Sequence, residues 1–106
     1  TAIGNDYGYE RLFARQIEAI GHAGDILFAI STSERSPNIL NAVRVARDKG
    51  LVTIGLTGRG GGELSGLCDH CLRTPSDLTP RIQDGHIAIG HTICYLIEQQ
   101  LFPKAP

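Results

Sequence analysis

Hydrophobic residues follow two alternating patterns along the chain, one typical of amphipathic helices and one typical of buried strands. Apolar residues at helical spacing predict helices over residues 9–20, 37–49, 63–67 and 79–101. Continuous apolar runs bounded by glycine or polar residues predict strands over residues 25–30, 51–57 and 70–74. The run over residues 25–30 is apolar on both sides, so we expect both of its faces to be buried.

Strands that alternate with helices form βαβ units, in which the strands are parallel and the crossovers are right-handed. The sequence therefore predicts one α/β domain over residues 1–106, built on a parallel sheet. Ligands of such a sheet bind beyond the carboxyl ends of its strands. Two segments fall there, Ser31–Ser36 after the first strand and Thr57–Gly62 after the second.

The first of these segments carries four hydroxyl side chains within six residues, at Ser31, Thr32, Ser33 and Ser36. They lie where a helix begins, and the first N–H groups of a helix have no partner within it and attract anions. Hydroxyls add donors that can turn toward phosphate oxygens. The segment therefore predicts a site for a phosphate-bearing small ligand. The alternative is an ordinary helix cap, because Ser36-Pro37 is also a common way to begin a helix.

The last predicted helix is apolar on two faces. One face carries Ile82, His86, Ile89, Ile93, Leu96 and Ile97. Ile87, Cys94 and Leu101 lie on another face, with Gln83 nearby, and His91 points about 180° away from Ile82. A helix with two apolar faces is expected to be buried twice, by its own sheet and by another subunit or segment.

Composition excludes several classes of protein. The net charge is −1, which gives no electrostatic attraction to nucleic acid, and no apolar run is long enough to span a membrane. The three cysteines are odd in number, which argues against a secreted disulfide framework and favours the reducing cytoplasm. Because the chain has no methionine and begins with Thr1, we interpret it as a piece of a longer protein.

Three further motifs have a structural interpretation that we favour over a functional one. Cys68 and Cys71 have the spacing of zinc ligands, but a structural zinc site needs four ligands, so we expect small, apolar, buried cysteines. Gly58–Gly62 does not complete the G-x-G-x-x-G motif and is expected to be a flexible turn. Asn5-Asp6-Tyr7, taken alone, is typical of a turn and cap.

The histidines differ in what they are expected to do. His86 lies on the main apolar face and is expected to be packed and hydrogen-bonded, whereas His22 is expected at the surface. His91 lies off that face and is the better candidate for acid–base or metal chemistry. Gln83 precedes His91 by about 12 Å of helix, so a shared metal ion would require both side chains to reach toward a point between them.

Four segments together resemble the sedoheptulose 7-phosphate isomerases, also called phosphoheptose isomerases, of the SIS (sugar isomerase) fold. The first two are Thr1-Ala-Ile-Gly-Asn-Asp-Tyr-Gly-Tyr-Glu10 and Ser31-Thr-Ser-x-x-Ser-Pro-Asn-Ile-Leu40. The other two are Leu56-Thr-Gly-x-x-Gly-Gly62 and Thr79-Pro-Arg-Ile-Gln-Asp-Gly-His86 followed by His91. The resemblance covers nearly the whole chain, and the combination is specific although each piece alone is not.

The resemblance implies a three-layer sheet flanked by helices, with the flavodoxin-like topology of the SIS fold. It also implies a cytoplasmic homotetramer with active sites between subunits and no nucleic-acid or membrane partner. The implied reaction is aldose–ketose isomerisation between sedoheptulose 7-phosphate and D-glycero-D-manno-heptose 7-phosphate, on the route to the heptose of lipopolysaccharide.

The resemblance also assigns roles to residues of this chain. Ser31, Thr32, Ser33 and Ser36 are implied to hold the sugar phosphate, and Asn5, Asp6 and Gln83 to contact the substrate. Gln83 and His91 are implied as zinc ligands. His91 is also the implied acid–base group for proton transfer through an enediol.

Two departures from the family bear on activity. The family's N-terminal helices and first strand, which carry a histidine and glutamate of the metal and base site, have no counterpart here, so we expect little or no turnover from this chain.

The second departure is Glu34, which stands where the family has glycine. If that position needs a positive φ, a side chain costs about 1–2 kcal/mol, and its carboxylate would oppose a phosphate unless it pointed to solvent. These departures keep open an alternative, a non-catalytic relative like the replication-initiator-associating proteins, which acts by binding a protein.

Overall fold

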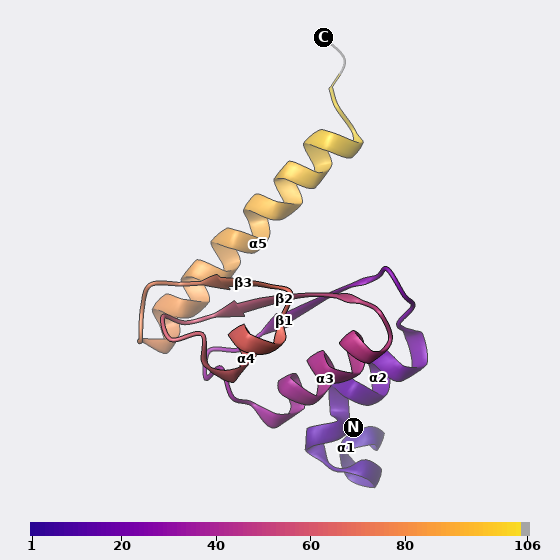
Figure 1. Cartoon of the computed structure of the whole chain (residues 1–106). Coiled ribbons are helices and arrows are strands. Elements are labelled where there is room, and N and C mark those ends of the chain that lie inside the picture. Colours follow the sequence, from indigo (N-terminus) through magenta and orange to yellow (C-terminus); the bar gives the residue numbers. More distant parts are fainter. Residues whose placement is uncertain (105–106) are drawn as a thin grey trace.

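The computed structural model describes residues 1–104 and contains three parallel strands with helices around them (Figure 1). The strands are β1 (Ile26–Ile30), β2 (Val52–Thr57) and β3 (His70–Arg73), and β2 lies in the middle. The helical elements are α1 (Ala2–Tyr7), the 3-10 turn η1 (Tyr9–Arg11), α2 (Leu12–Ile20), α3 (Pro37–Asp48), α4 (Gly62–Leu67) and α5 (Thr79–Leu101). The predicted α/β alternation is confirmed, and every strand, and every helix from α3 onward, lies within one residue of its expected ends.

The N-terminal segment differs from the expectation. Asn5 and Asp6 lie inside helix α1, so the interpretation of this stretch as a turn and cap is wrong. The turn comes at Gly8, whose φ of 89° is open to glycine and costly for other residues. The expected helix over residues 9–20 consequently begins as the 3-10 turn η1 and continues as α2.

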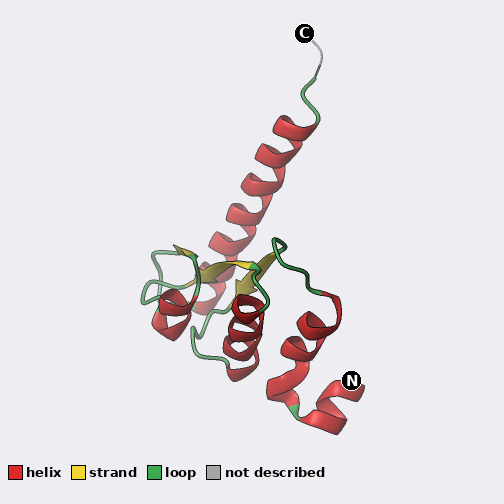
Figure 2. Ribbon diagram, turned by 45° about the vertical axis from the view of Figure 1, so that its right-hand side comes forward, coloured by secondary structure: helices red, strands yellow, loops and turns green. Residues whose placement is uncertain are grey.

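Helices α2, α3 and α4 lie on one side of the sheet (Figure 2). The core on that side contains the fully or nearly fully buried side chains of Ala29, Leu40, Val43 and Leu64. Ala29 belongs to β1, Leu40 and Val43 to α3, and Leu64 to α4, so this cluster joins the strand to both helices. Burial of such side chains is the main stabilising contribution to a domain of this size.

The other face of β1 is open, and the expectation that both of its faces are buried is wrong. Ile26 is 61% exposed, Phe28 39% and Ile30 52%. Their neighbours in register on β2 are Val52, Ile54 and Leu56. An apolar run indicates that both faces of a strand pack against apolar residues. It does not show whether the element that covers the second face belongs to the same polypeptide.

Helix α5 lies on this second face but touches the sheet only through its first turns. Ile82 and His86 are buried, and Gly85 lies so close to Thr74 that a Cβ at position 85 would be 2.5 Å from the Thr74 Cγ2. The ring of His86 contacts the backbone carbonyl of Thr57 at the end of β2, 3.0 Å from its Nε2. This docking places Gln83 beside the loop that follows β1.

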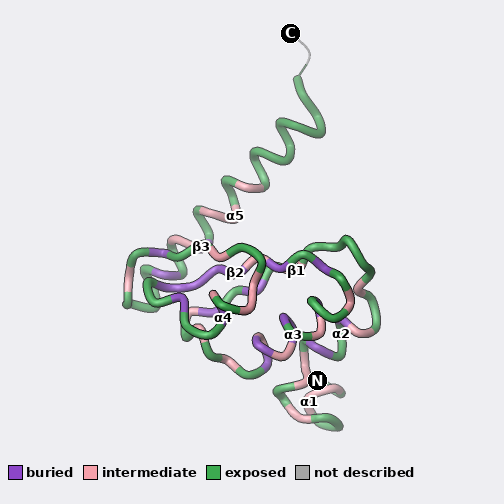
Figure 3. Tube along the Cα trace, in the orientation of Figure 1, coloured by how far each residue is buried: buried purple, intermediate pink, exposed green. Residues whose placement is uncertain are grey.

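Beyond His86 the helix leaves the sheet, as the exposed tube in Figure 3 shows. Of the six residues predicted as its buried face, only Ile82 and His86 are buried, and Leu96 and Ile97 are half exposed. The sheet of the described chain therefore buries only the first turns of this face, and burial of the rest by another subunit or segment stays a prediction. Neither α5 nor any other helix within residues 1–104 is long and apolar enough to cross a membrane.

The close approach of Gly85 to Thr74 generates a prediction for stability. Gly85→Ala should lower the free energy of unfolding by about 1–3 kcal/mol, because the added methyl group forces α5 away from the strand ends. Gly90→Ala is the matched control, since beyond the neighbouring residues and backbone of its own helix nothing lies within 4 Å of its added Cβ, and the helix gains about 0.5–1 kcal/mol from alanine. Urea unfolding of both variants tests this, and equal stabilities would contradict the docking described above.

Candidate functional site

A pocket of about 400 Å³ opens at the carboxyl edge of the sheet, between the loop after β1 and the start of α5. Its lining comes from the last residue of β1, the loop and α5: Ile30, Ser31, Thr32, Ser36, Gln83, His86 and Ile87. None of these residues carries a carboxylate. The pocket therefore lies where the βαβ topology predicts a ligand site, and its polar groups are hydroxyls, an amide and an imidazole.

The hydroxyl groups of the loop are only partly used within the protein. The Oγ of Ser31 accepts a hydrogen bond from the Glu34 N–H at 3.0 Å. Ser33 Oγ lies 2.9 Å from Ser36 Oγ and 3.4 Å from Ser31 Oγ. Each hydroxyl has one proton, so these two contacts use at most two protons of the three serines. One serine proton and the Thr32 hydroxyl proton remain available to a ligand.

Backbone groups add further donors. Within residues 1–104, the N–H groups of Thr32, Ser33 and Ser36 donate to no other part of the chain. Ser36 is also the N-cap of α3, a helix of 12 residues that begins at Pro37, and its side chain makes no capping hydrogen bond. The hydroxyls are thus not spent on an ordinary helix cap, and the loop presents several free donors at the positive end of a helix.

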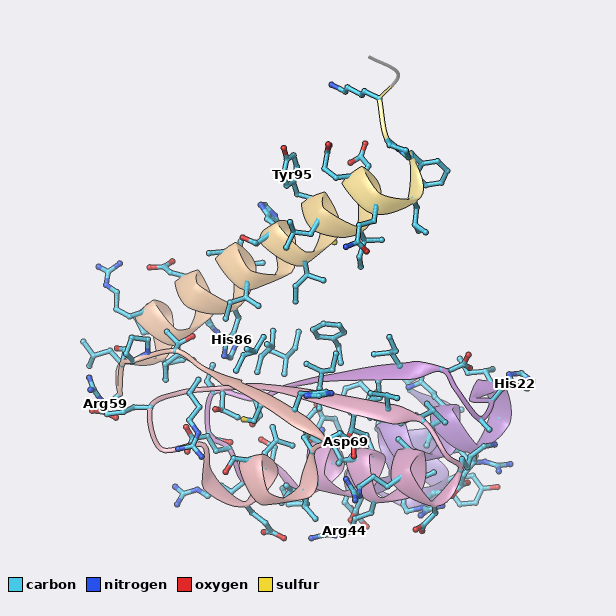
Figure 4. The ribbon with its side chains drawn as sticks, turned by 45° about the horizontal axis from the view of Figure 1, so that its top comes forward. His22, Arg44, Arg59, Asp69, His86 and Tyr95 are labelled. Atoms are coloured by element: carbon cyan, nitrogen blue, oxygen red, sulfur yellow. The ribbon has the colours of Figure 1, made fainter. Side chains whose placement is uncertain are left out.

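His86 fixes the other wall of the pocket, and Figure 4 shows its side chain directed from α5 toward the sheet. Because the carbonyl of Thr57 can only accept, Nε2 of His86 must carry the proton of their 3.0 Å hydrogen bond. The expectation of a packed, hydrogen-bonded histidine is confirmed. Its place in the pocket was not predicted from the sequence, although Gln83 and His86 are three residues apart and so share a helix face.

The structure brings together some of the candidate residues and not others. Ser31, Thr32, Ser36 and Gln83 line the same pocket. The Oγ of Ser33 lies within hydrogen-bonding distance of two of them, 2.9 Å from Ser36 Oγ and 3.4 Å from Ser31 Oγ. Asn5 and Asp6 lie exposed on α1, where the Asn5 amide donates to the Asp6 carboxylate at 2.8 Å, and neither lines the pocket.

His91 also lies outside the pocket lining. It is exposed on α5, two helical turns beyond Gln83. His22, in contrast, was expected to be a surface residue, and its exposed side chain confirms this.

Glu34 has the strained backbone that the sequence pointed to. Its φ is 63°, and within residues 1–104 no other residue except glycine has a positive φ. Its carboxylate points neither into the pocket lining nor freely to solvent, but lies against the turn Gly58–Gly62. A left-handed conformation costs a residue with a side chain about 1–2 kcal/mol, which other contacts of the loop must offset.

The described residues do not form a metal site by themselves. Within residues 1–104, no three His, Cys, Asp or Glu side chains are placed to hold a metal ion. Gln83 and His91 provide two donors where zinc takes four. Cys68 and Cys71 are free and partly buried, and burial raises the pKa of the Cys68 thiol, which keeps it protonated rather than ready to bind metal.

Comparison with known proteins gives consistent matches. A family model described as the SIS domain matches residues 1–58. The chain is 55% identical over 104 residues to phosphoheptose isomerase 2 of Campylobacter jejuni, covering 98% of this chain and 52% of that protein. It is 58% identical over 101 residues to the phosphoheptose isomerase of Aliarcobacter butzleri, covering 95% and 53%. The chain thus spans about half the length of the curated relatives it matches.

Solved structures show the same similarity. The phosphoheptose isomerase of Neisseria gonorrhoeae superposes with a TM-score of 0.88 at 43% identity, over 91% of this chain and 55% of that one. The enzyme of Francisella tularensis gives a TM-score of 0.89 at 44% identity, over 92% and 53%. The fold described above is therefore that of the corresponding half of these proteins.

The position of the Glu34 carboxylate generates a prediction for anion binding. Glu34→Gln keeps the shape of the side chain and removes its charge, so inorganic phosphate should bind about two- to sixfold more tightly. This range follows from about 0.5–1 kcal/mol for charges roughly 8 Å apart at an effective dielectric of 40–80. Calorimetric titration at low and high salt measures it, with Glu63→Gln on α4 as the control. An unchanged affinity would show that the carboxylate is too distant or too screened to matter.

Proposed function

The chain belongs to the SIS domain family, and since its relatives there are phosphoheptose isomerases, we propose that it binds a sugar phosphate in the pocket between Ser31–Ser36 and α5. The observation that carries this proposal is the set of free hydroxyl and backbone donors at the start of α3. A phosphate monoester needs several donors of this kind, and no carboxylate lines the pocket to repel it at contact distance.

The reaction we propose is the isomerisation of sedoheptulose 7-phosphate to D-glycero-D-manno-heptose 7-phosphate, on the route to lipopolysaccharide heptose. Ser31, Thr32, Ser33 and Ser36 hold the phosphate, and the amide of Gln83 orients the sugar. The open-chain sugar then extends along α5 toward His91. The imidazole there takes a proton from one carbon and returns it to the adjacent carbon through an enediol. A second proton passes from the hydroxyl oxygen that becomes the carbonyl to the carbonyl oxygen that becomes the hydroxyl, so no atoms are gained or lost.

We further propose that this chain turns over little by itself. The pocket lining contains no carboxylate base, and the Nε2 proton of His86 is used by Thr57. Zinc is implied by the resemblance, but Gln83 and His91 alone do not supply its four ligands, so none of the steps above depends on a metal. Asn5 and Asp6 lie outside the pocket, and a role for them in substrate binding requires a site shared with a second copy.

The partner we propose is therefore a further copy of the same chain, in a homotetramer of the cytoplasm. The exposed apolar residues of α5 and the open face of β1 support self-association. The free cysteines fit a reducing compartment. The same apolar surface also suits the alternative function, a non-catalytic SIS-domain protein that binds another protein.

Sugar-phosphate binding is tested by removing one free donor. Thr32→Val keeps the size of the side chain, and its loss of a hydroxyl should weaken the binding of sedoheptulose 7-phosphate by roughly 10–100-fold, the value of one hydrogen bond to a charged group. Thr92→Val, on the exposed part of α5, is the matched control. Calorimetry measures binding, and an isomerase assay beside the Campylobacter jejuni enzyme, with zinc analysis of both, measures turnover. Equal affinities for both variants would reject the pocket as the phosphate site.

Self-association is tested on the same helix. Ile97→Glu places a charge in the apolar surface of α5 and should shift the chain to a smaller assembly, because burying an unpaired carboxylate is costly. Gln99→Glu adds the same charge at a polar position and should leave the assembly intact. Light scattering after gel filtration gives the masses, and a monomeric unmodified chain would refute the proposed homotetramer.

A further inference from the structure

The backbone N–H and carbonyl of Glu34 are both hydrogen-bonded, one within the serine–threonine loop and the other to α4. Its N–H donates to the Oγ of Ser31 at 3.0 Å. Its carbonyl accepts a longer hydrogen bond, 3.4 Å, from the N–H of Leu64 in α4. Glu34 is therefore the residue at which the loop after β1 and the segment after β2 meet.

The side chain of Glu34 lies in a trough formed by three glycines. A Cβ at Gly62 would be 2.6 Å from the Cβ of Glu34, and one at Gly58 would be 3.0 Å from its Oε1. A Cβ at Gly60 would be 2.9 Å from Oε2. These glycines leave the space that the glutamate side chain occupies.

Gly60 is the position where this contact stands alone. The three atoms nearest to a Cβ at Gly60 all belong to the Glu34 carboxylate group, and φ of Gly60 lies outside the positive range. At Gly58 the same Cβ would also meet Ile82 and the Ser76 carbonyl. An alanine at position 60 therefore meets the Glu34 carboxylate first, at 2.9 Å from its Oε2.

We propose that Glu34 is a positioning residue that locks the glycine turn Gly58–Gly62 against the serine–threonine loop and so holds the Ser31 hydroxyl in place for a bound phosphate. The proposal rests on the proposed function of the pocket. This lock acts through the backbone of Glu34. While the Glu34 side chain lies between the three glycines, its left-handed conformation is held and directs its N–H to Ser31 Oγ. The Ser31 oxygen then accepts this hydrogen bond, so the proton of the Ser31 hydroxyl points away from the Glu34 N–H.

The lock predicts that the effect of Gly60→Ala depends on the residue at position 34. In the unmodified chain and in Glu34→Gln, which has the same shape, Gly60→Ala should weaken the binding of inorganic phosphate at least about threefold, as expected for directly contacting residues. In Glu34→Gly the same change should have little effect, because the three atoms nearest to the added methyl group are then absent. Gly66→Ala, whose Cβ has open space, is the control in all three backgrounds.

Two measurements separate the lock from the function on which it rests. Amide NMR spectra of the ligand-free chains report the lock: Gly60→Ala should shift the Ser31 and Leu64 signals with Glu34 or Gln at position 34, but not with Gly. Equal shifts in all three backgrounds would overturn the lock. Calorimetry with phosphate reports the function, and absence of binding to the unmodified chain would overturn the phosphate pocket itself. Gly60→Ala could also weaken phosphate binding equally in all three backgrounds, or weaken binding and lower thermal stability together. Either result would show that Glu34 has a structural role only.

Discussion

The candidate site depends on the contact between the first two turns of α5 and the ends of β2 and β3. His86 donates to the Thr57 carbonyl, and Gly85 allows the helix to approach Thr74 more closely than any larger residue could. This contact is small, because the rest of α5 leaves the sheet. It nevertheless decides where Gln83 lies, and without it the hydroxyl loop would face solvent instead of a second wall.

The anion binding that we propose for the pocket rests on dipoles rather than on charged side chains. Its donors are hydroxyls and backbone N–H groups at the start of α3, and none of the residues that line it is acidic or basic apart from His86. Such a site binds well only when its donors are held in advance, because each dipole contributes little if it must first be ordered. The strained backbone conformation of Glu34 and the position of its side chain between Gly58, Gly60 and Gly62 are consistent with this requirement.

Local patterns in the sequence were sufficient to predict the sheet, the position of α3, and the hydroxyl loop, because periodicity and capping are local properties. They failed at Asn5 and Asp6, whose turn-forming preference is overridden by the break at Gly8, and at β1, whose second apolar face has no cover within the described residues. The positive φ of Glu34 was anticipated from the glycine of the family. The direction of its carboxylate was not, since the contact with Gly60 joins segments that are distant in sequence.

The central claim is that the loop after β1 is a seat for a phosphate group, and backbone NMR during a titration with inorganic phosphate tests it most directly. The account predicts that the amide signals of Thr32, Ser33 and Ser36 move together and saturate at one phosphate per chain, while those of the exposed end of α5 stay fixed. Signals that do not move, or that move without saturation across the surface, would contradict it.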